Sequence, residues 1–391
     1  MTAHQPRVII VGAGIGGLTA AVALRRVGVD VAIYERAPEL AAAGSGLSIM
    51  SNAVSALATL GIDLQLERHG QAIESFEFLT RDGREIRTLP LKEIGDRLGA
   101  PSINIGRTEL QQALLAGLDG QPVELAATVT DVETTASGVR VTFADGRETH
   151  GDALIGADGL HSVVRSRISG PTPLREPGYV CWLAVVPFRH DRLPAGAVRH
   201  YWGAGQRFGL IDIGHGRAYW WGTKNMSAAA ARGWQGDKAE IERAYADWAD
   251  EVGEVIRVTP AEAIISVPAQ DRPFLARWGA GPVTLLGDAA HPMLTSLGQG
   301  AGSAMEDAVV LARSLAGVAA ADVPLALRRY ERTRRARTRQ LVQTSRAVSL
   351  IEQAERPLAR RLRDAYFRWV PGPVLYRQNA AVLTFPGGGS A

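Results

Sequence analysis

An apolar, β-branched run near the amino terminus leads directly into a glycine loop. Residues 7–11 read Arg-Val-Ile-Ile-Val, and Gly12, Gly14 and Gly17 follow with the spacing G-x-G-x-x-G. A helical pattern then begins at Leu18 and places apolar residues on one side. A strand, a tight turn and a helix in this order predict a Rossmann-like α/β fold that binds a dinucleotide.

Each position of this loop has an expected role in holding a pyrophosphate. Gly12 allows the tight turn, Gly14 lets the backbone approach the phosphates, and Gly17 lets the helix pack closely on the strand. Ile15 and Gly16 lie within the glycine loop, just before the helix whose positive end meets the phosphates. We expect all five residues to take part in binding.

A second strand over residues 29–34 ends at Glu35 and Arg36. An acidic residue about 20 residues beyond the glycines is the usual acceptor for ribose hydroxyls, and Glu35 fits that position. Arg36 is placed to lie over the adenine. This context separates the loop from a chance glycine turn, which the glycine spacing alone would not do.

A late segment indicates which dinucleotide is bound. An apolar strand ends at Gly287, Asp288 follows it, and the next helix is expected to begin at about Ser303. Backbone that can approach a flat group, after a carboxylate at a strand end, is typical of a second grip on a flavin, so we predict FAD. Asp288 would accept from the ribityl hydroxyls. The small residues expected at the flavin ring are Gly298, Gly300, Ala301 and Gly302.

The composition fits a globular enzyme with two domains. The chain has 391 residues, of which 46% are hydrophobic and 21% charged, which is enough for two substantial cores. The net charge of +3 gives no basic face for nucleic acid. An arginine-rich stretch, residues 328–339, could bind an anionic partner, but the solvated face of a long helix is the favoured interpretation.

Cysteine usage and the amino terminus predict a cytoplasmic protein. Cys181 is the one cysteine, so there is no intrachain disulfide and no second thiol for a zinc site. Residues 1–6 lack the features of a signal peptide, and no stretch is long and apolar enough to span a membrane. We therefore expect no metal and no stable membrane insertion.

The nucleotide-binding motifs are spread along the chain, so we expect a discontinuous FAD-binding domain. Its segments are residues 1–70, 98–175 and 275–345. Residues 71–97 and 176–274 are rich in alternating and aromatic residues, which predicts an inserted β-sheet substrate domain. One helix, residues 238–251, is expected to interrupt that sheet. Residues 346–391 are expected to form C-terminal helices.

Three motifs carry a family resemblance that covers nearly the whole chain. They are the loop at Gly12, the stretch from Asp158 to Arg165 with the pattern D-G-x-x-S-x-x-R, and the Gly287-Asp288 segment. In order and spacing they resemble the class A flavin monooxygenases related to para-hydroxybenzoate hydroxylase. The chain looks most like the branch that includes salicylate, urate and 3-hydroxybenzoate hydroxylases and zeaxanthin epoxidases.

The resemblance implies an FAD-dependent monooxygenase. Such an enzyme uses NADPH or NADH and O2 to hydroxylate or epoxidise an aromatic or polycyclic, polyketide-like small molecule through a flavin C4a-hydroperoxide. It implies that Arg107 also holds FAD and that Asp158 serves both FAD and NAD(P)H. Gly46 and Val129 complete the expected cofactor-binding set, and many relatives carry Asn or Cys where Gly302 stands. We expect a monomer or a homodimer.

Fewer sequence features indicate which residues form the substrate site. A phenolic substrate would need a base, and His200 and Tyr219 are candidates, with Arg207 as an anion partner. For each of these residues, a structural role in a strand is the alternative to a catalytic role. His291 is better placed, beside Pro292, which with the glycines offers a flat, dry wall for the flavin.

Two other functions remain open. A flavin oxidase or dehydrogenase shares the glycine loop but generally lacks the Asp158 segment. A binding protein, or one in which FAD shapes a pocket for a non-redox reaction, would keep the loops without redox chemistry. The intact Gly287-Asp288 segment argues against loss of FAD.

Overall fold

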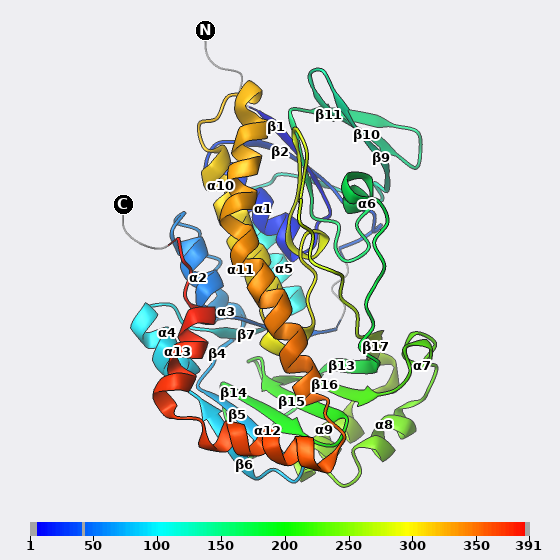
Figure 1. Cartoon of the computed structure of the whole chain (residues 1–391), viewed down its shortest axis with the longest axis vertical. Coiled ribbons are helices and arrows are strands. Elements are labelled where there is room, and N and C mark those ends of the chain that lie inside the picture. Colours follow the sequence, from blue (N-terminus) through cyan, green and yellow to red (C-terminus); the bar gives the residue numbers. More distant parts are fainter. Residues whose placement is uncertain (1–5, 41–43, 388–391) are drawn as a thin grey trace.

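A five-stranded parallel sheet organises the part of the chain that contains the glycine loop. The computed structural model describes residues 6–40 and 44–387, arranged as in Figure 1. The sheet has the strand order β18-β12-β1-β2-β8. Its strands are β1 (Arg7–Val11), β2 (Asp30–Tyr34), β8 (Val123–Glu124), β12 (Ala153–Gly156) and β18 (Val283–Leu285). Because these strands are far apart in the sequence, the sheet is assembled discontinuously.

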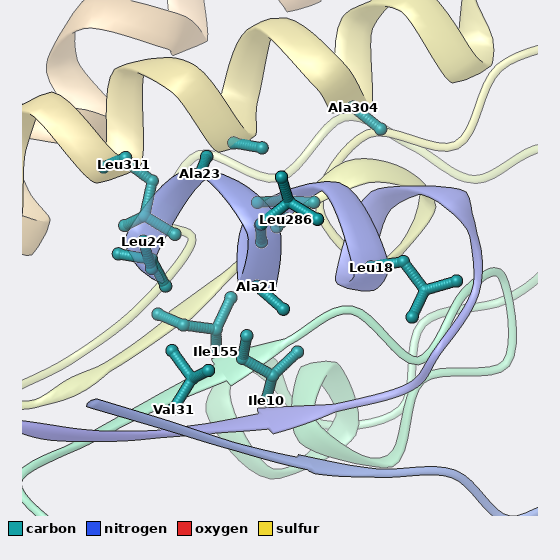
Figure 2. Close-up of a cluster of buried hydrophobic side chains, with 14 of the residues drawn as sticks. Ile10, Leu18, Ala21, Ala23, Leu24, Val31, Ile155, Leu286, Ala304 and Leu311 are labelled. Atoms are coloured by element: carbon teal, nitrogen blue, oxygen red, sulfur yellow. The ribbon is translucent and has the colours of Figure 1, made fainter. Parts of the chain in front are cut away.

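Helix α1 (Ile15–Arg26) lies between this sheet and α10 (Gly300–Leu315), and apolar side chains of all three layers form one core (Figure 2). Gly16 makes the close approach possible. A Cβ at this position would lie 2.9 Å from Cδ2 of Leu286 and 3.2 Å from Cβ of Ala304. Gly16 therefore serves the packing of α1 against its neighbours.

The tryptophan-rich segments form a separate seven-stranded sheet with the order β17-β13-β16-β15-β14-β5-β6. One face of it is covered by an apolar core that includes Trp182, Phe208 and Trp220. An early hairpin, β5 and β6, joins this sheet beside β14. The strands are β5 (Ser75–Thr80), β6 (Glu85–Leu89), β13 (Tyr179–Pro187), β14 (Ala197–Trp202), β15 (Gln206–Asp212), β16 (Arg217–Asn225) and β17 (Ile265–Pro268).

Smaller elements surround the two sheets. Two three-stranded sheets have the orders β3-β7-β4 and β11-β10-β9. Their strands are β3 (Gly46–Ile49), β4 (Gln71–Ala72), β7 (Ile103–Gly106), β9 (Val129–Thr135), β10 (Gly138–Phe143) and β11 (Glu148–Gly151). The shorter helices are α2 (Ser51–Ala58), α3 (Leu66–His69), α4 (Leu91–Leu98), α5 (Arg107–Ala116), α6 (Val163–Ser169), α7 (Ala228–Arg232), α8 (Lys238–Ala244) and α9 (Asp250–Val258).

One helix connects the two parts of the molecule. α11 (Val323–Glu352) packs on α10 and ends beside the seven-stranded sheet (Figure 1). Near its start the hydroxyl of Tyr330 donates to the carbonyl of Leu285 at 3.0 Å, and near its end Ser349 lies 3.0 Å from the Tyr179 hydroxyl. The chain continues as α12 (Pro357–Trp369) and α13 (Gly372–Leu383). Within the described ranges, no helix combines the length and the apolar character that crossing a bilayer requires.

The expectation of one helix over residues 238–251 is wrong. α8 ends at Ala244 and α9 begins at Asp250. Between them Tyr245 turns into the core, where its hydroxyl donates to the carbonyls of Arg207 and Thr223 at 3.1 and 2.9 Å. This buried anchor ends the first helix. The helix expected at about residue 303 begins at residue 300, and expectations for residues 1–5, 41–43 and 388–391 lie outside the described residues.

Replacing Phe208 with alanine tests the core of the seven-stranded sheet. Phe208 is fully buried and stacks on Trp220 with ring centroids 5.4 Å apart, so its truncation leaves a cavity. We expect the free energy of unfolding, measured with urea, to fall by about 3–5 kcal/mol. Leu325→Ala, at an exposed position of α11, is the control and should change it by less than about 0.5 kcal/mol. Equal effects of the two changes would contradict the tight packing of this core.

Candidate active site

In the glycine loop, a side chain would have open space at one position and would collide with backbone atoms at two others. Gly12 has a φ of 103°, and a Cβ there would lie 2.5 Å from the carbonyl oxygen of Ala157. At Gly17 a Cβ would lie 1.9 Å from the carbonyl oxygen of Gly12. By contrast, no heavy atom lies within 4 Å of a Cβ built on Gly14. Gly14 is also the N-cap of α1 and has no side chain to satisfy the first N–H groups of that helix. Free donors beside an open approach are what a bound pyrophosphate requires.

Glu35 contacts this loop, and the two arginines expected at the cofactor are exposed. Glu35 Oε2 accepts a hydrogen bond from the N–H of Ala13 at 2.7 Å. Arg36 and Arg107 are exposed. Arg107 is the first residue of α5, and its N–H donates to the carbonyl of Ser45 at 2.9 Å. The carboxylate at the end of β2 thus lies at the glycine loop, as its place in the sequence predicted.

Asp288 lies in the short turn that follows β18. Its carboxylate forms no hydrogen bond or ion pair with the residues that the structure describes. The residue is exposed by surface area, yet protein atoms surround it on most sides. This burial raises the pKa of Asp288, and the nearby His291 and Arg107 oppose the shift. An accessible carboxylate without a protein partner is available to hydroxyl groups of a ligand.

The loop after β18 is held in place by Asp307 of α10. Asp307 Oδ2 accepts from the N–H of Gly287 at 3.1 Å and lies 2.5 Å from Nε2 of His291. Arg334 donates from Nε to the other carboxylate oxygen at 2.6 Å. Burial alone would raise the pKa of Asp307, but the charges of His291 and Arg334 outweigh it and lower that pKa. His291 is therefore a buried partner of Asp307, and its catalytic role stays a prediction.

A second buried network joins α2 to the start of α10. Asn52 donates from Nδ2 to Gln299 at 3.0 Å and to Glu306 at 2.6 Å. Glu306 in turn pairs with Arg334 at 2.6 Å. Asn52, Gln299 and Glu306 were not among the residues predicted from the sequence. The available signal was the pair Glu306-Asp307 within an otherwise apolar helix, since buried charges require partners.

The prediction that the arginine-rich stretch is a solvated face is wrong for Arg334. This residue is 2% exposed, because the buried carboxylates of Glu306 and Asp307 require a positive partner. Arg332 and Arg339 are exposed and line a surface groove of about 580 Å³ between α11 and residues 273–276.

The Asp158 segment supports the Asp288 loop from the other side. Asp158 accepts from the hydroxyl of Ser162 at 2.5 Å and from the N–H of Val163 at 2.7 Å, so it caps α6. Burial raises the pKa of Asp158, against the effect of the Ser162 hydrogen bond. Arg165 of α6 is buried and donates to the carbonyls of residues 289 and 290 at 3.1 and 3.2 Å. Burial lowers the pKa of Arg165 to about 10, so it remains charged at neutral pH.

A buried cluster lies where α11 ends against the seven-stranded sheet. Arg207 of β15 and Glu352 of α11 form a close ion pair, and each is 1% exposed. Arg207 Nη1 also donates to the hydroxyl of Ser296 at 3.0 Å. Ser296 belongs to the short turn that ends just before Gly298. The cluster therefore touches the loop that the sequence places at the flavin ring.

Part of the Arg207 guanidinium has no protein partner. Its Nε and Nη2 are buried and form no hydrogen bond in the described part of the chain. The guanidinium lies over the rings of Tyr179 and Trp221, at 5.6 and 5.3 Å from their centroids. Burial works to lower the pKa of Arg207, but Glu352 outweighs it and the pKa is raised. Two unpaired donors among aromatic rings can hold an acceptor atom of a flat ligand.

His200 and Tyr219 lie on the strands on either side of β15. His200 is buried against the rings of Trp221 and Phe78, at 4.9 and 5.1 Å. Burial, followed by the charges of Arg207 and Arg363, lowers the pKa of His200 well below its usual value. Burial also raises the pKa of Tyr219. At neutral pH His200 is thus uncharged and Tyr219 keeps its proton. Their catalytic roles stay predictions.

Other residues of the expected set lie in several places. A Cβ at Gly46 would lie 2.6 Å from the Tyr219 ring, so this glycine lets β3 meet the seven-stranded sheet. At Gly302 a Cβ would make only ordinary contacts, the nearest at 3.4 Å. Val129 is buried in the apolar core, and Pro292 is buried beside His291. Gly298, Gly300 and Ala301 lie at or next to the start of α10.

The residues present fit FAD. The open approach at Gly14 suits a pyrophosphate, and the unpaired carboxylate of Asp288 suits hydroxyl groups. When bound, FAD supplies the electron transfer and the oxygen activation. We expect α1 and the Asp288 loop, with its supports Asp307 and Arg165, to position the cofactor.

Comparison with known proteins agrees with this geometry. A family described as FAD binding domain matches residues 5–345. Aurachin C monooxygenase/isomerase from Stigmatella aurantiaca is 39% identical over 92% of this chain and 93% of its own length. The 2-heptyl-3-hydroxy-4(1H)-quinolone synthase of Pseudomonas aeruginosa is 32% identical, over 96% and 97% respectively. The crystal structure of Klebsiella pneumoniae HpxO with FAD and uric acid has a TM-score of 0.90 and 30% identity, and covers 98% of this chain and 97% of its own.

The chain belongs to this FAD-binding family, and it is an FAD-dependent monooxygenase that acts on an aromatic substrate with NAD(P)H as the usual reductant of such enzymes. The predicted fold class, a Rossmann-like FAD-binding fold with a β-sheet insertion and C-terminal helices, is confirmed. The oxidase and non-redox alternatives are therefore set aside.

Replacing Asp288 with alanine tests the predicted contribution of this residue to FAD binding. We expect the Kd for FAD to rise about tenfold to hundredfold, because a hydrogen bond to a charged group contributes about 1.5–3 kcal/mol. Titration of the apoprotein, followed by flavin fluorescence, measures the Kd. Asp247→Ala, at an exposed position between α8 and α9, is the matched control. An unchanged Kd in the Asp288 variant would remove that residue from FAD binding.

The buried His200 predicts a pH dependence of stability. Its pKa is depressed in the folded state, so below about 6.5 the unfolded chain binds a proton that the folded chain does not. Stability should therefore fall as pH decreases from about 6.5, by about 1.4 kcal/mol per pH unit from this residue. Urea unfolding at several pH values should show a shallower slope in His200→Phe. The exposed His150→Phe is the control, and an equal slope in both variants would contradict the assignment.

Proposed function

We propose that this monooxygenase acts on a neutral, flat heteroaromatic compound that presents a carbonyl or ring-nitrogen acceptor to Arg207. The observation that carries this proposal is the state of the Arg207 guanidinium. Its charge is already balanced by Glu352, while its Nε and Nη2 remain buried and unpaired. The group therefore offers hydrogen bonds without an unbalanced positive charge.

An anionic substrate fits this cluster poorly. A carboxylate brought to Arg207 would lie close to Glu352, which is itself buried. Two buried carboxylates beside one guanidinium leave a net negative charge in a region of low dielectric, and such a charge costs several kcal/mol. The burial that raises the pKa of Glu352 against the pull of Arg207 shows the same cost for one carboxylate.

The surrounding side chains support a flat aromatic shape. Trp221 and Tyr179 lie against the guanidinium, and Phe78 packs on His200. Ser296 hydrogen-bonds Arg207 and is next but one to Gly298, so it links this cluster to the loop at the flavin. We assign Arg207 and Ser296 to orienting the substrate.

Two relatives have names that fit this substrate class, a synthase of a 4(1H)-quinolone and a monooxygenase of aurachin C. Others, the 3-amino-4-hydroxybenzoate 2-monooxygenases of Streptomyces, are named for a substrate that carries a carboxylate. We propose a compound of the quinolone type for this chain. A cytoplasmic location and a monomeric or homodimeric state stay predictions from the sequence.

Anaerobic mixing with NADPH or NADH tests the proposal, with flavin bleaching as the readout. A 4(1H)-quinolone is compared with the same ring system carrying a carboxylate. We expect the neutral compound to accelerate bleaching at least about tenfold more, since a discrimination of about 1.4 kcal/mol suffices. On admission of air the neutral compound should gain one oxygen atom, detected by mass spectrometry.

Glu352→Gln is the variant that separates charge from shape. It keeps the size of the side chain and removes its charge, so Arg207 is left unbalanced and the preference should shift toward the carboxylate. Flavin content and the melting temperature show that the variant is folded. A wild-type enzyme stimulated only by the carboxylate compound would refute the proposal.

A further inference from the structure

Exposed large apolar side chains are concentrated in one short region. Seven of the eleven that the described residues contain lie between the end of α11 and the start of α13. They are Leu350, Ile351, Leu358, Leu362, Tyr366, Trp369 and Val374. Single exposed apolar residues need no explanation, but a cluster of them marks a surface for interaction.

Four of these residues form a stripe along α12. Leu358, Leu362, Tyr366 and Trp369 follow one another at spacings of four, four and three residues, which places them on one face of the helix. Their exposed fractions are 69, 62, 53 and 78%. Figure 1 shows α12 along the lower edge of the molecule, beside the seven-stranded sheet. We call these four residues the α12 stripe.

A surface helix usually buries its apolar face. In α12 the apolar face is exposed and the opposite face is buried. On the side opposite the stripe, Arg363 is 4% exposed and donates to the carbonyl of Glu352 at 3.1 Å. Its guanidinium lies 4.7 Å from the ring of Trp202, and the ring of Phe367 lies 4.8 Å from the same ring. These contacts hold the inner face, so α12 cannot turn its stripe toward the core.

Positive charge flanks the α12 stripe. Arg356, Arg361 and Arg368 are exposed, and none of them forms an ion pair with a described residue. A second copy of the chain that paired through this face would bring the same arginines together around a two-fold axis, which is repulsive. An anionic surface with an apolar layer beneath it matches both the charge and the stripe.

We propose that α12 binds the surface of a bilayer that contains anionic lipid. The α12 stripe lies in the boundary between headgroups and acyl chains, and the three arginines contact phosphate groups. The helix lies on the membrane and does not cross it. Because Phe367 of α12 packs on Phe78, which in turn packs on His200, the bound face lies over the Arg207 cluster.

Co-sedimentation of the FAD-loaded chain with vesicles tests this proposal. One set contains phosphatidylcholine and phosphatidylglycerol in equal parts, and the other contains phosphatidylcholine alone. We expect binding to the first set in about 0.1 M salt and at least about tenfold weaker binding to the second. The double variant Leu362→Ser with Trp369→Ser should lose binding by a similar factor. Leu325→Ser is the matched control, since Leu325 is 72% exposed but lies at the other end of α11.

A second double variant, Arg361→Gln with Arg368→Gln, keeps the apolar stripe and removes charge. It should weaken binding to the phosphatidylglycerol vesicles and reduce the dependence of binding on salt. Flavin absorbance and the melting temperature show whether each variant is folded. If the wild type does not sediment with vesicles, or if the stripe variant binds as the wild type does, the proposal fails. It also fails if size-exclusion chromatography shows a dimer that the stripe variant dissociates, because the face then belongs to a second copy.

Discussion

The buried carboxylate of Asp307 is the interaction on which the flavin-binding loop depends. It holds the N–H of Gly287, the imidazole of His291 and the guanidinium of Arg334. Because Asp307 is fully buried, removal of a partner would leave a charge without compensation, which costs several kcal/mol. Gly287 adopts a φ of 61°, and the turn it makes presents Asp288 to a ligand. A residue within α10 thus fixes the turn that carries Asp288.

Much of the cofactor site could be predicted because its signals are local. The strand and the glycines follow one another directly, Glu35 stands at the separation that the dinucleotide-binding pattern specifies, and Asp288 directly follows a strand. The supports of the site could not be predicted in this way. Arg334 reaches a carboxylate 27 residues away, and Arg165 reaches a carbonyl 124 residues away. The sequence does not show which residues so far apart come into contact. An arginine-rich stretch is therefore predicted to be solvated when the positions of its carboxylate partners are unknown.

Helix orientation shows a second limit of sequence patterns. The periodicity of α12 indicates an amphipathic helix, but the usual rule that its apolar side is buried does not hold. The contacts of Arg363 and Phe367 with Trp202 decide the orientation instead. The helix expected over residues 238–251 failed for a related reason, since the fit of Tyr245 between two strands outweighed its helical spacing.

Helix α11 carries Arg334, which pairs with Asp307 beneath the Asp288 loop, and Glu352, which balances the charge of Arg207. A continuous helix advances about 1.5 Å and turns about 100° with each residue. The number of residues between these two side chains therefore sets both their separation along the helix and the angle between their directions. One inserted residue would leave each local sequence intact and still turn Glu352 away from Arg207. The number of residues between Arg334 and Glu352 therefore also sets how the Asp288 loop is oriented relative to the Arg207 cluster.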